Sequence, residues 1–115
     1  MKNQTHIQER YLRDPLPVKL GGLAANLARV KSFSGHPKNS ATVESLIDES
    51  KYFVEWAAPE AEVETQAALA ALQVQLALWQ LRWPRIWADP AQRALVANQA
   101  EQWSDQILAM SGLLD

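Results

Sequence analysis

The 115-residue sequence predicts an all-α protein, an up-down helical bundle of four main helices preceded by a short N-terminal helix. Apolar residues recur at helical spacing along most of the chain, and no segment alternates apolar and polar residues as a half-buried strand does. Residues that begin or end helices separate these stretches at short intervals. We expect residues 1–115 to form one domain, because a chain of this length buries about two-thirds of its surface on folding.

The first two helices are expected on either side of Pro15. Thr5 and Gln8 have the spacing of a capping box and are expected to open the short N-terminal helix. Asp14 is expected to cap the next helix, with Pro15 at its first position. The buried stripe of that helix is expected to comprise Leu16, Leu20, Leu23, Leu27 and Val30.

The third helix is expected to follow a short loop. Gly35 is predicted to end the second helix in the left-handed conformation, and Pro37 prevents the helix from resuming. Asn39 or Ser40 then caps the third helix. Its buried face is predicted to comprise Val43, Leu46, Ile47, Ser50, Phe53, Val54 and Ala57.

The fourth helix is expected to start at Pro59. Glu60, Glu62 and Glu64 would then lie in its first turns, where the helix dipole favours anions. The residues before Pro59 are alanines, which are poor caps, so the sequence leaves open whether this junction is a tight hairpin or a kink.

The last helix has the clearest boundaries. Asp89 is expected to cap it, Pro90 occupies its first turn, and Gly112 is expected to end it. A Schellman motif at Gly112 would bring Leu113 against Leu108. The buried stripe is predicted to comprise Val96, Ala100, Trp103, Ile107 and Met110.

The fourth helix has two apolar faces, whereas a helix at the corner of a monomeric bundle needs one. The first face comprises Leu69, Leu72, Leu76, Trp79 and Trp83. The second face comprises Val63, Ala67, Ala70, Val74, Ala77 and Leu81. Either this helix is central within one chain, or a second chain covers the second face, and we favour a homodimer.

The second helix carries small residues opposite its leucines, among them Gly21, Gly22 and Ala25. Two adjacent glycines weaken a helix by roughly 1 kcal/mol each relative to alanine. They indicate close approach of another helix, from this chain or a partner, or else a tolerant exposed face. A phosphate-binding loop is excluded, because no Lys-Ser/Thr follows the glycines and no strand precedes them.

The segment from Glu9 to Val30, with Asp14-Pro15-Leu16-Pro17 and the Gly21-Gly22 pair, resembles small, uncharacterised all-α proteins of cyanobacteria. The resemblance extends along most of the chain. It implies an all-α fold and carries no activity, ligand or functional residue.

Aromatic and basic residues are concentrated around Pro84. Trp and Arg are enriched at protein interfaces. Trp79 and Trp83 continue the first face of the fourth helix and are expected in the core, whereas Arg82, Arg85 and Trp87 are expected at the surface. Whether Pro84 kinks or ends the helix is left open.

Catalytic and metal-binding patterns are absent from the sequence. His6 and His36 lie in a terminal segment and a Gly-His-Pro loop, where surface positions are the simpler interpretation. No Glu-x-x-His pair supports a di-iron bundle, and zero Cys excludes thiol chemistry and Cys-based zinc sites. We therefore expect no catalytic residue, no metal site and no cofactor.

The function that these features favour is a non-catalytic protein-interaction or assembly module that self-associates as a homodimer, or binds another protein, through surplus apolar helix faces. The predicted partner-binding residues are Val63, Val74, Leu81, Arg82, Arg85, Trp87, Gly21 and Ala25. The alternative is a binder of a small apolar or aromatic ligand in a bundle pocket lined by Trp79, Trp83 and Arg82. An enzyme ranks third.

Charge and hydropathy argue against other partners. The formal net charge is -2 and the basic residues are dispersed, which gives no basis for nucleic-acid binding. The longest uncharged run, Thr65 to Leu81, is shorter than a typical membrane span and contains several glutamines. The polar N-terminus lacks the apolar core of a secretory signal, so we expect a cytoplasmic protein.

Overall fold

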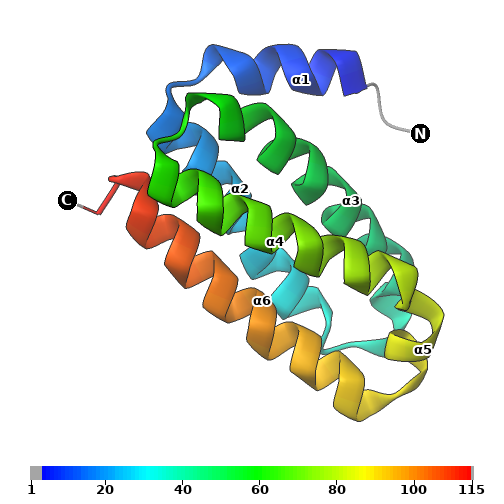
Figure 1. Cartoon of the computed structure of the whole chain (residues 1–115). Helices are drawn as coiled ribbons and strands as arrows, with labels where there is room; N and C mark the ends of the chain where they lie inside the picture. The colour runs from blue at the N-terminus through cyan, green and yellow to red at the C-terminus, as the bar shows by residue number, and fades with distance from the viewer. Residues whose placement is uncertain (1–3, 115) are drawn as a thin grey trace.

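The computed structural model describes residues 4–114 and confirms the all-α class (Figure 1). No strand occurs in these residues. The α-helices are α1 (Gln4–Arg13), α2 (Leu16–Phe33), α3 (Ser40–Ala57), α4 (Val63–Leu81), α5 (Trp83–Ala88) and α6 (Pro90–Ser111). Two 3-10 turns, η1 (Pro37–Asn39) and η2 (Ala58–Glu60), precede α3 and α4.

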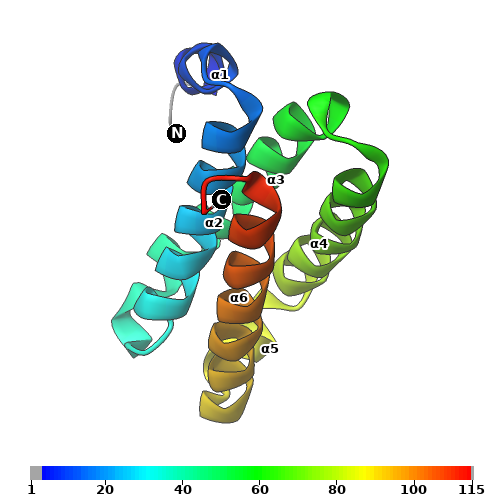
Figure 2. The same cartoon turned by 90° about the vertical axis from the view of Figure 1, so that its left-hand side faces the viewer.

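The four long helices lie alongside one another, and α1 lies outside them (Figures 1 and 2). The most extensive contacts join α2 to α6, and α3 contacts both α2 and α4. Contact between α4 and α6 is slight by comparison. One long edge of α4 is therefore less covered than the edge that faces α3.

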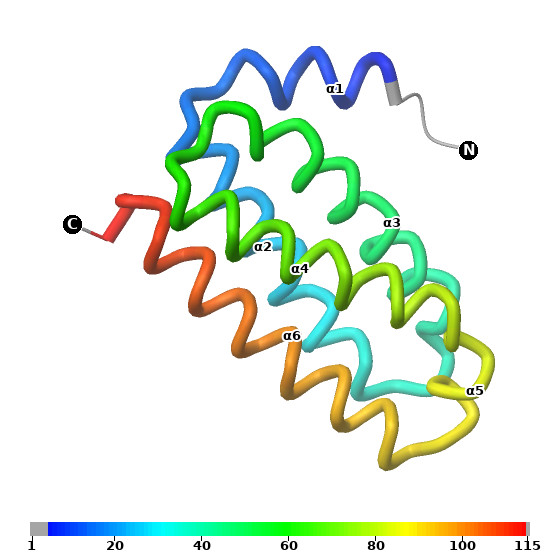
Figure 3. The backbone as a smooth tube through the Cα atoms, in the orientation of Figure 1, coloured from blue at the N-terminus to red at the C-terminus, as the bar shows by residue number. Residues whose placement is uncertain are grey.

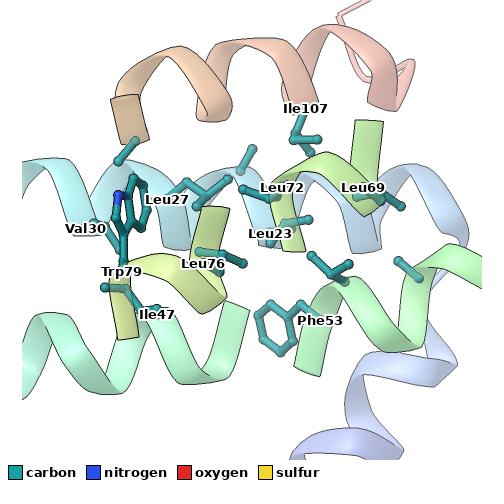
Figure 4. Close-up of a cluster of buried hydrophobic side chains, with 14 of the residues drawn as sticks. Leu23, Leu27, Val30, Ile47, Phe53, Leu69, Leu72, Leu76, Trp79 and Ile107 are labelled. Carbon is teal, nitrogen blue, oxygen red and sulfur yellow. The ribbon is translucent and has the colours of Figure 1, made fainter. Parts of the chain in front are cut away.

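The core is built from the stripes that helical periodicity predicts. Leu23, Leu27, Ile47, Leu72 and Ile107 are fully buried and come from all four long helices. Figure 4 shows these side chains meeting between the helices. Burying an aliphatic side chain of this size contributes about 1.5–3 kcal/mol, so this cluster supplies much of the driving force for folding.

Small residues allow α2 and α6 to approach closely. Ala24 of α2 and Ala100 of α6 are buried. The buried Ser104 hydroxyl on α6 donates a hydrogen bond of 2.8 Å to the backbone carbonyl of Ala24. A side chain that reaches the backbone of a neighbouring helix requires the small separation that alanine and serine permit.

The predicted boundaries of the last helix are confirmed. Asp89 precedes α6, and its Oδ1 accepts a hydrogen bond of 2.9 Å from the Ala91 amide. Gly112 ends the helix with φ of 83°, in the left-handed region that favours glycine.

The predicted caps of α1 and α2 are wrong. The described part of α1 already starts at Gln4, so Thr5 lies inside the helix rather than at its cap. The residue that caps α2 is Pro15, not Asp14, and its backbone is extended. The extended backbone of Pro15 places it before the helix, and the Lys19 amide donates the first intrahelical hydrogen bond to the Pro15 carbonyl at 3.1 Å.

The predicted left-handed Gly35 is also wrong, since Gly112 is the residue of positive φ in the described chain. The end of α2 is satisfied by side chains instead. The Ser34 hydroxyl donates to the Val30 carbonyl at 2.6 Å, and the Asn39 amide group donates to the Phe33 carbonyl at 3.0 Å. With these carbonyls occupied, a left-handed residue is not needed to end the helix.

The start of α4 differs from the prediction as well. Pro59 lies in η2, Ala61 is extended, and α4 begins at Val63, so the junction is a tight turn that precedes the helix. The carboxylate of Glu60 pairs with the Lys19 ammonium group, whose side chain is 1% exposed. A buried cation without a partner is costly, so this ion pair holds the turn against α2.

The helix breaks before Pro84. α4 ends at Leu81 and Pro84 lies in the first turn of α5, where its missing amide hydrogen costs little. The short α5 then leads the chain back along α6 (Figure 3).

Tyr11 anchors α1 to the rest of the protein. Its ring stacks on Phe53 of α3 with centroids 4.2 Å apart, and its hydroxyl donates a 2.6 Å hydrogen bond to the Lys19 carbonyl. Burial raises the pKa of the Tyr11 phenol well above its usual range, and the carboxylates of Asp14 and Glu60 raise it further. The folded protein therefore favours the neutral phenol.

Leu72→Ala should destabilise the protein by about 2–5 kcal/mol, because it leaves a cavity where α4 meets the core. The matched control is Leu114→Ala, which makes the same change at an exposed position and should cost less than about 0.5 kcal/mol. Urea unfolding followed by circular dichroism measures both. Equal losses would contradict the assignment of Leu72 to the core.

The stability of the protein should decline above pH of about 10, because tyrosine ionises in the unfolded chain while the folded protein keeps the Tyr11 proton. Below that pH the phenol is neutral in both states and this contribution is constant. Tyr11→Phe should flatten the decline, whereas Tyr52→Phe, the matched control, should preserve it. Urea unfolding at several alkaline pH values compares the variants, and an identical decline in Tyr11→Phe and the parent would contradict the prediction.

Candidate functional site

The candidate site is the outer face of α4, which comprises Val63, Ala67, Ala70, Val74, Ala77 and Leu81. All six residues are exposed, and three of them expose large apolar side chains: Val63 at 80%, Val74 at 61% and Leu81 at 78%. The opposite face of the same helix, including Leu69, is buried in the core. Within this chain α4 is therefore not a central helix with both apolar faces covered.

The spacing along the outer face is that of a helix–helix seam. Successive members are separated alternately by four and three residues, which is the heptad repeat of coiled coils. Ala67, Ala70 and Ala77 leave room for the backbone of a second helix. Single exposed apolar residues are common on protein surfaces, whereas a contiguous apolar row marks an interaction site.

The side of the outer face next to α3 is held in place by polar contacts. The Gln73 side-chain amide donates to the Lys51 carbonyl at 3.1 Å, and the Lys51 ammonium group donates to Gln80 Oε1 at 2.7 Å. Gln80 also donates to Asp48 Oδ1 at 3.2 Å. These glutamines join α4 to α3 and leave the apolar row itself uncovered.

The side next to α6 extends the apolar surface. Leu78 of α4 and Leu95 of α6 are both exposed, and both line a hollow of about 160 Å³ between the two helices. Sequence periodicity missed both residues, because Leu78 lies off both predicted stripes of its helix and Leu95 lies beside the buried stripe of α6. Leu95 directly precedes Val96, a member of the predicted stripe, and this position off the stripe is the sequence signal that could have identified it.

The predicted Trp/Arg cluster around Pro84 contains both buried and exposed residues, and its two core tryptophans lie where the sequence predicts. Trp79 and Trp83 are buried. Arg82 and Arg85 are exposed and share a shallow hollow with Leu81 at the end of the outer face. The structure therefore brings these two arginines to the predicted interface.

Trp87 is less available than predicted, because it is half-buried against the core. Its indole nitrogen donates a 2.8 Å hydrogen bond to the Pro37 carbonyl, and Arg93 lies over its ring at 5.5 Å. These contacts hold the start of α6 and η1 together. They give Trp87 a structural role within the chain, apart from the outer face of α4.

Gly21 and Ala25 lie away from the outer face of α4, on a half-buried side of α2. They line a hollow of about 510 Å³ with Leu108 and Leu113. A Cβ atom on Gly21 would lie 2.6 Å from Leu113 Cδ1. The close approach that the glycines predict is therefore made by the C-terminal segment of the same chain.

The hollow between α4 and α6 brings together only two of the three residues of the alternative ligand pocket. Trp79 and Arg82 border the hollow between α4 and α6, but its volume of about 160 Å³ is small beside the 300–1,000 Å³ typical of ligand pockets. Trp83 does not line that hollow. Its indole nitrogen donates to the Ser40 hydroxyl at 3.2 Å, and its ring packs on Trp87.

A larger hollow lies beneath α1, with a volume of about 570 Å³. Arg10, Arg13, Asp14 and Glu49 border it together with the stacked rings of Tyr11 and Phe53. The charges of both signs are mixed, and Glu49 accepts a 3.0 Å hydrogen bond from the buried Asn26. This polar network joins α2 to α3.

Among residues 4–114, no group of three or more histidine, aspartate or glutamate side chains is arranged to hold a metal ion. None of the helices in this range is both long and apolar enough to cross a membrane.

Comparisons with models of protein families, with curated proteins and with solved structures found no match to this chain. The resemblance to cyanobacterial proteins therefore stays a prediction. The functional argument depends on the geometry of the chain itself.

Gly22→Ala should stabilise the protein by about 0.5–1 kcal/mol, because alanine favours the helix and the new Cβ would lie at an ordinary 3.7 Å from Tyr11 Cε1. Gly21→Ala should gain less, since Leu113 must move to admit the methyl group. Thermal unfolding of the two variants measures the difference. A larger gain at Gly21 would contradict the packing of Leu113 against α2.

Proposed function

We propose that this protein is a non-catalytic assembly module that self-associates through the outer face of α4. In this proposal α2, α3, α4 and α6 form an up-down four-helix bundle, and the outer face of α4 receives the partner. The observation that carries the proposal is the exposure of the outer face: Val63, Val74 and Leu81 are largely exposed along a single side of α4.

The chemistry of the outer face supports a helix as its partner. Its members follow heptad spacing, and alanines between the larger residues allow close helix packing. Its neighbours Leu78 and Leu95 widen the apolar area toward α6. A flat strip of this kind fits another helix better than a small molecule, which binds in a concave pocket.

The charge pattern supports a second copy as that partner. No charged residue occurs from Thr65 to Leu81, so two copies of this strip meet without like-charge repulsion. A homodimer also uses the same patch on both subunits, which is the commonest arrangement among oligomers.

Val74→Glu tests the proposal, because it places a charge in the middle of the outer face. The variant should shift sedimentation from dimer to monomer over a concentration series and should keep the helicity of the parent. The buried core is not altered, since Val74 lies on the solvent side of α4. The cost of burying an unpaired carboxylate at the seam explains the dissociation.

Asn98→Glu is the matched control, because it adds a carboxylate at an exposed position of α6 outside the outer face of α4. It should sediment as the parent does. A parent protein that remains monomeric throughout the series would overturn self-association. Loss of helicity in Val74→Glu would show that Val74 belongs to the core of the folded chain.

A further inference from the structure

We infer that the partner of the outer face is α4 of a second copy in antiparallel orientation, held in register by reciprocal Glu64–Arg82 ion pairs. The inference rests on the proposed self-association and goes further by specifying the orientation, the register and the charged contacts. Two independent features support it: the order of large and small residues along the outer face, and the position of charges at its two ends.

The order of side-chain sizes is matched when α4 is reversed against itself. Val63 and Leu81 are eighteen residues apart, which is about five full turns, so they lie on one line at opposite ends of α4. In an antiparallel pair centred on residue 72, Val63 faces Leu81 of the second copy. Ala67 then faces Ala77, and Ala70 faces Val74. The antiparallel pair thus places each Val74 against an alanine, whereas a parallel pair would place Val74 against Val74 beside a layer of two alanines.

The charges at the ends of α4 are complementary in the same register. Glu64 and Arg82 are exposed and are also eighteen residues apart, so both lie on the same side of the outer face. In an antiparallel pair the two sides that carry them face each other, and each Glu64 lies close to an Arg82. In a parallel pair the two flanks that carry these residues lie on opposite sides of the seam, so no reciprocal Glu64–Arg82 pair forms.

The other charged groups near this face do not offset the pattern. Lys51 and Asp48 of α3 are bound to Gln80 on the opposite side of the outer face. Gln75, Gln92 and Gln99, which border the α4–α6 hollow, are uncharged. Arg85 lies beside Leu81 and Arg82, and therefore strengthens the positive end.

Disulfide trapping tests the orientation, because the chain has no cysteine and every disulfide must come from an introduced pair. Val63→Cys and Leu81→Cys are prepared separately, one carrying an affinity tag so that the copies differ in size. Each variant is oxidised alone, and the two are then oxidised as a mixture. Ser32→Cys, an exposed position on α2, controls for collisional cross-linking.

The antiparallel pair predicts a mixed disulfide between position 63 of one copy and position 81 of the other. Val63→Cys alone should remain uncross-linked, because the two introduced thiols would be roughly 27 Å apart along the helices. A disulfide spans Cα atoms only about 4.4–6.8 Å apart. Efficient cross-linking of each variant alone, with no excess of the mixed product, would show a parallel pair and overturn the inference while leaving self-association intact.

Two further outcomes separate this inference from the proposed function. The parent could sediment as a dimer while the Val63→Cys and Leu81→Cys mixture cross-links no better than Ser32→Cys. That outcome would overturn the antiparallel seam alone. A parent that sediments as a monomer would overturn both proposals.

Charge exchange tests the ion pairs. Arg82→Glu should weaken dimerisation by about tenfold in Kd, since each of two contacts changes from attraction to repulsion. Adding Glu64→Arg to Arg82→Glu should restore most of the affinity. Equal weakening in the single and double variants would overturn the Glu64–Arg82 pairing.

Discussion

The structure depends on how the inner stripe of α4 packs into the core. Leu72 and Leu76 are fully buried, and Trp79 extends the same line toward α5. Because a helix is rigid over nineteen residues, burial of this stripe also determines which residues face away from the core. Val74 and Leu81 are exposed as a consequence of that packing. The proposed assembly surface is thus determined by the core rather than by any loop.

The two edges of α4 differ in how they are covered. Gln73 and Gln80 bind groups of α3, so that edge is closed by hydrogen bonds as well as by packing. The opposite edge has only slight contact with α6 and leaves Leu78 and Leu95 exposed. The α6 side of the outer face is therefore the more apolar of its two edges.

Much of the fold could be predicted from the sequence, because periodicity and caps are local signals. Most residues of the predicted stripes of α2, α3, α4 and α6 lie in the core, whereas Leu16, Leu46, Trp103 and Met110 are half-buried. Asp89 and Gly112 mark the ends of α6 as predicted. The exposure of the second α4 face follows from the same periodicity. What local signals could not supply is which residues meet across the chain.

Long-range partners explain the predictions that failed. Glu60 was expected in the first turn of a helix, but its partner is Lys19, which is distant in sequence and buried on α2. The stack of Tyr11 on Phe53 likewise joins two helices whose pairing no spacing rule indicates. Trp83 does not border the α4–α6 hollow with Trp79 and Arg82, and its contacts are with Ser40 and Trp87 instead.

The attachment of α1 has a consequence for the cooperativity of unfolding. From Thr5 to Arg13, Tyr11 is the buried residue, while the neighbouring helices share an extensive core. A segment with one principal anchor opens at a lower free energy than the body to which it is attached. Backbone amides of α1 should therefore exchange with deuterium faster than those of α2 and α6, as a separate unit that detaches while the remaining helices stay folded.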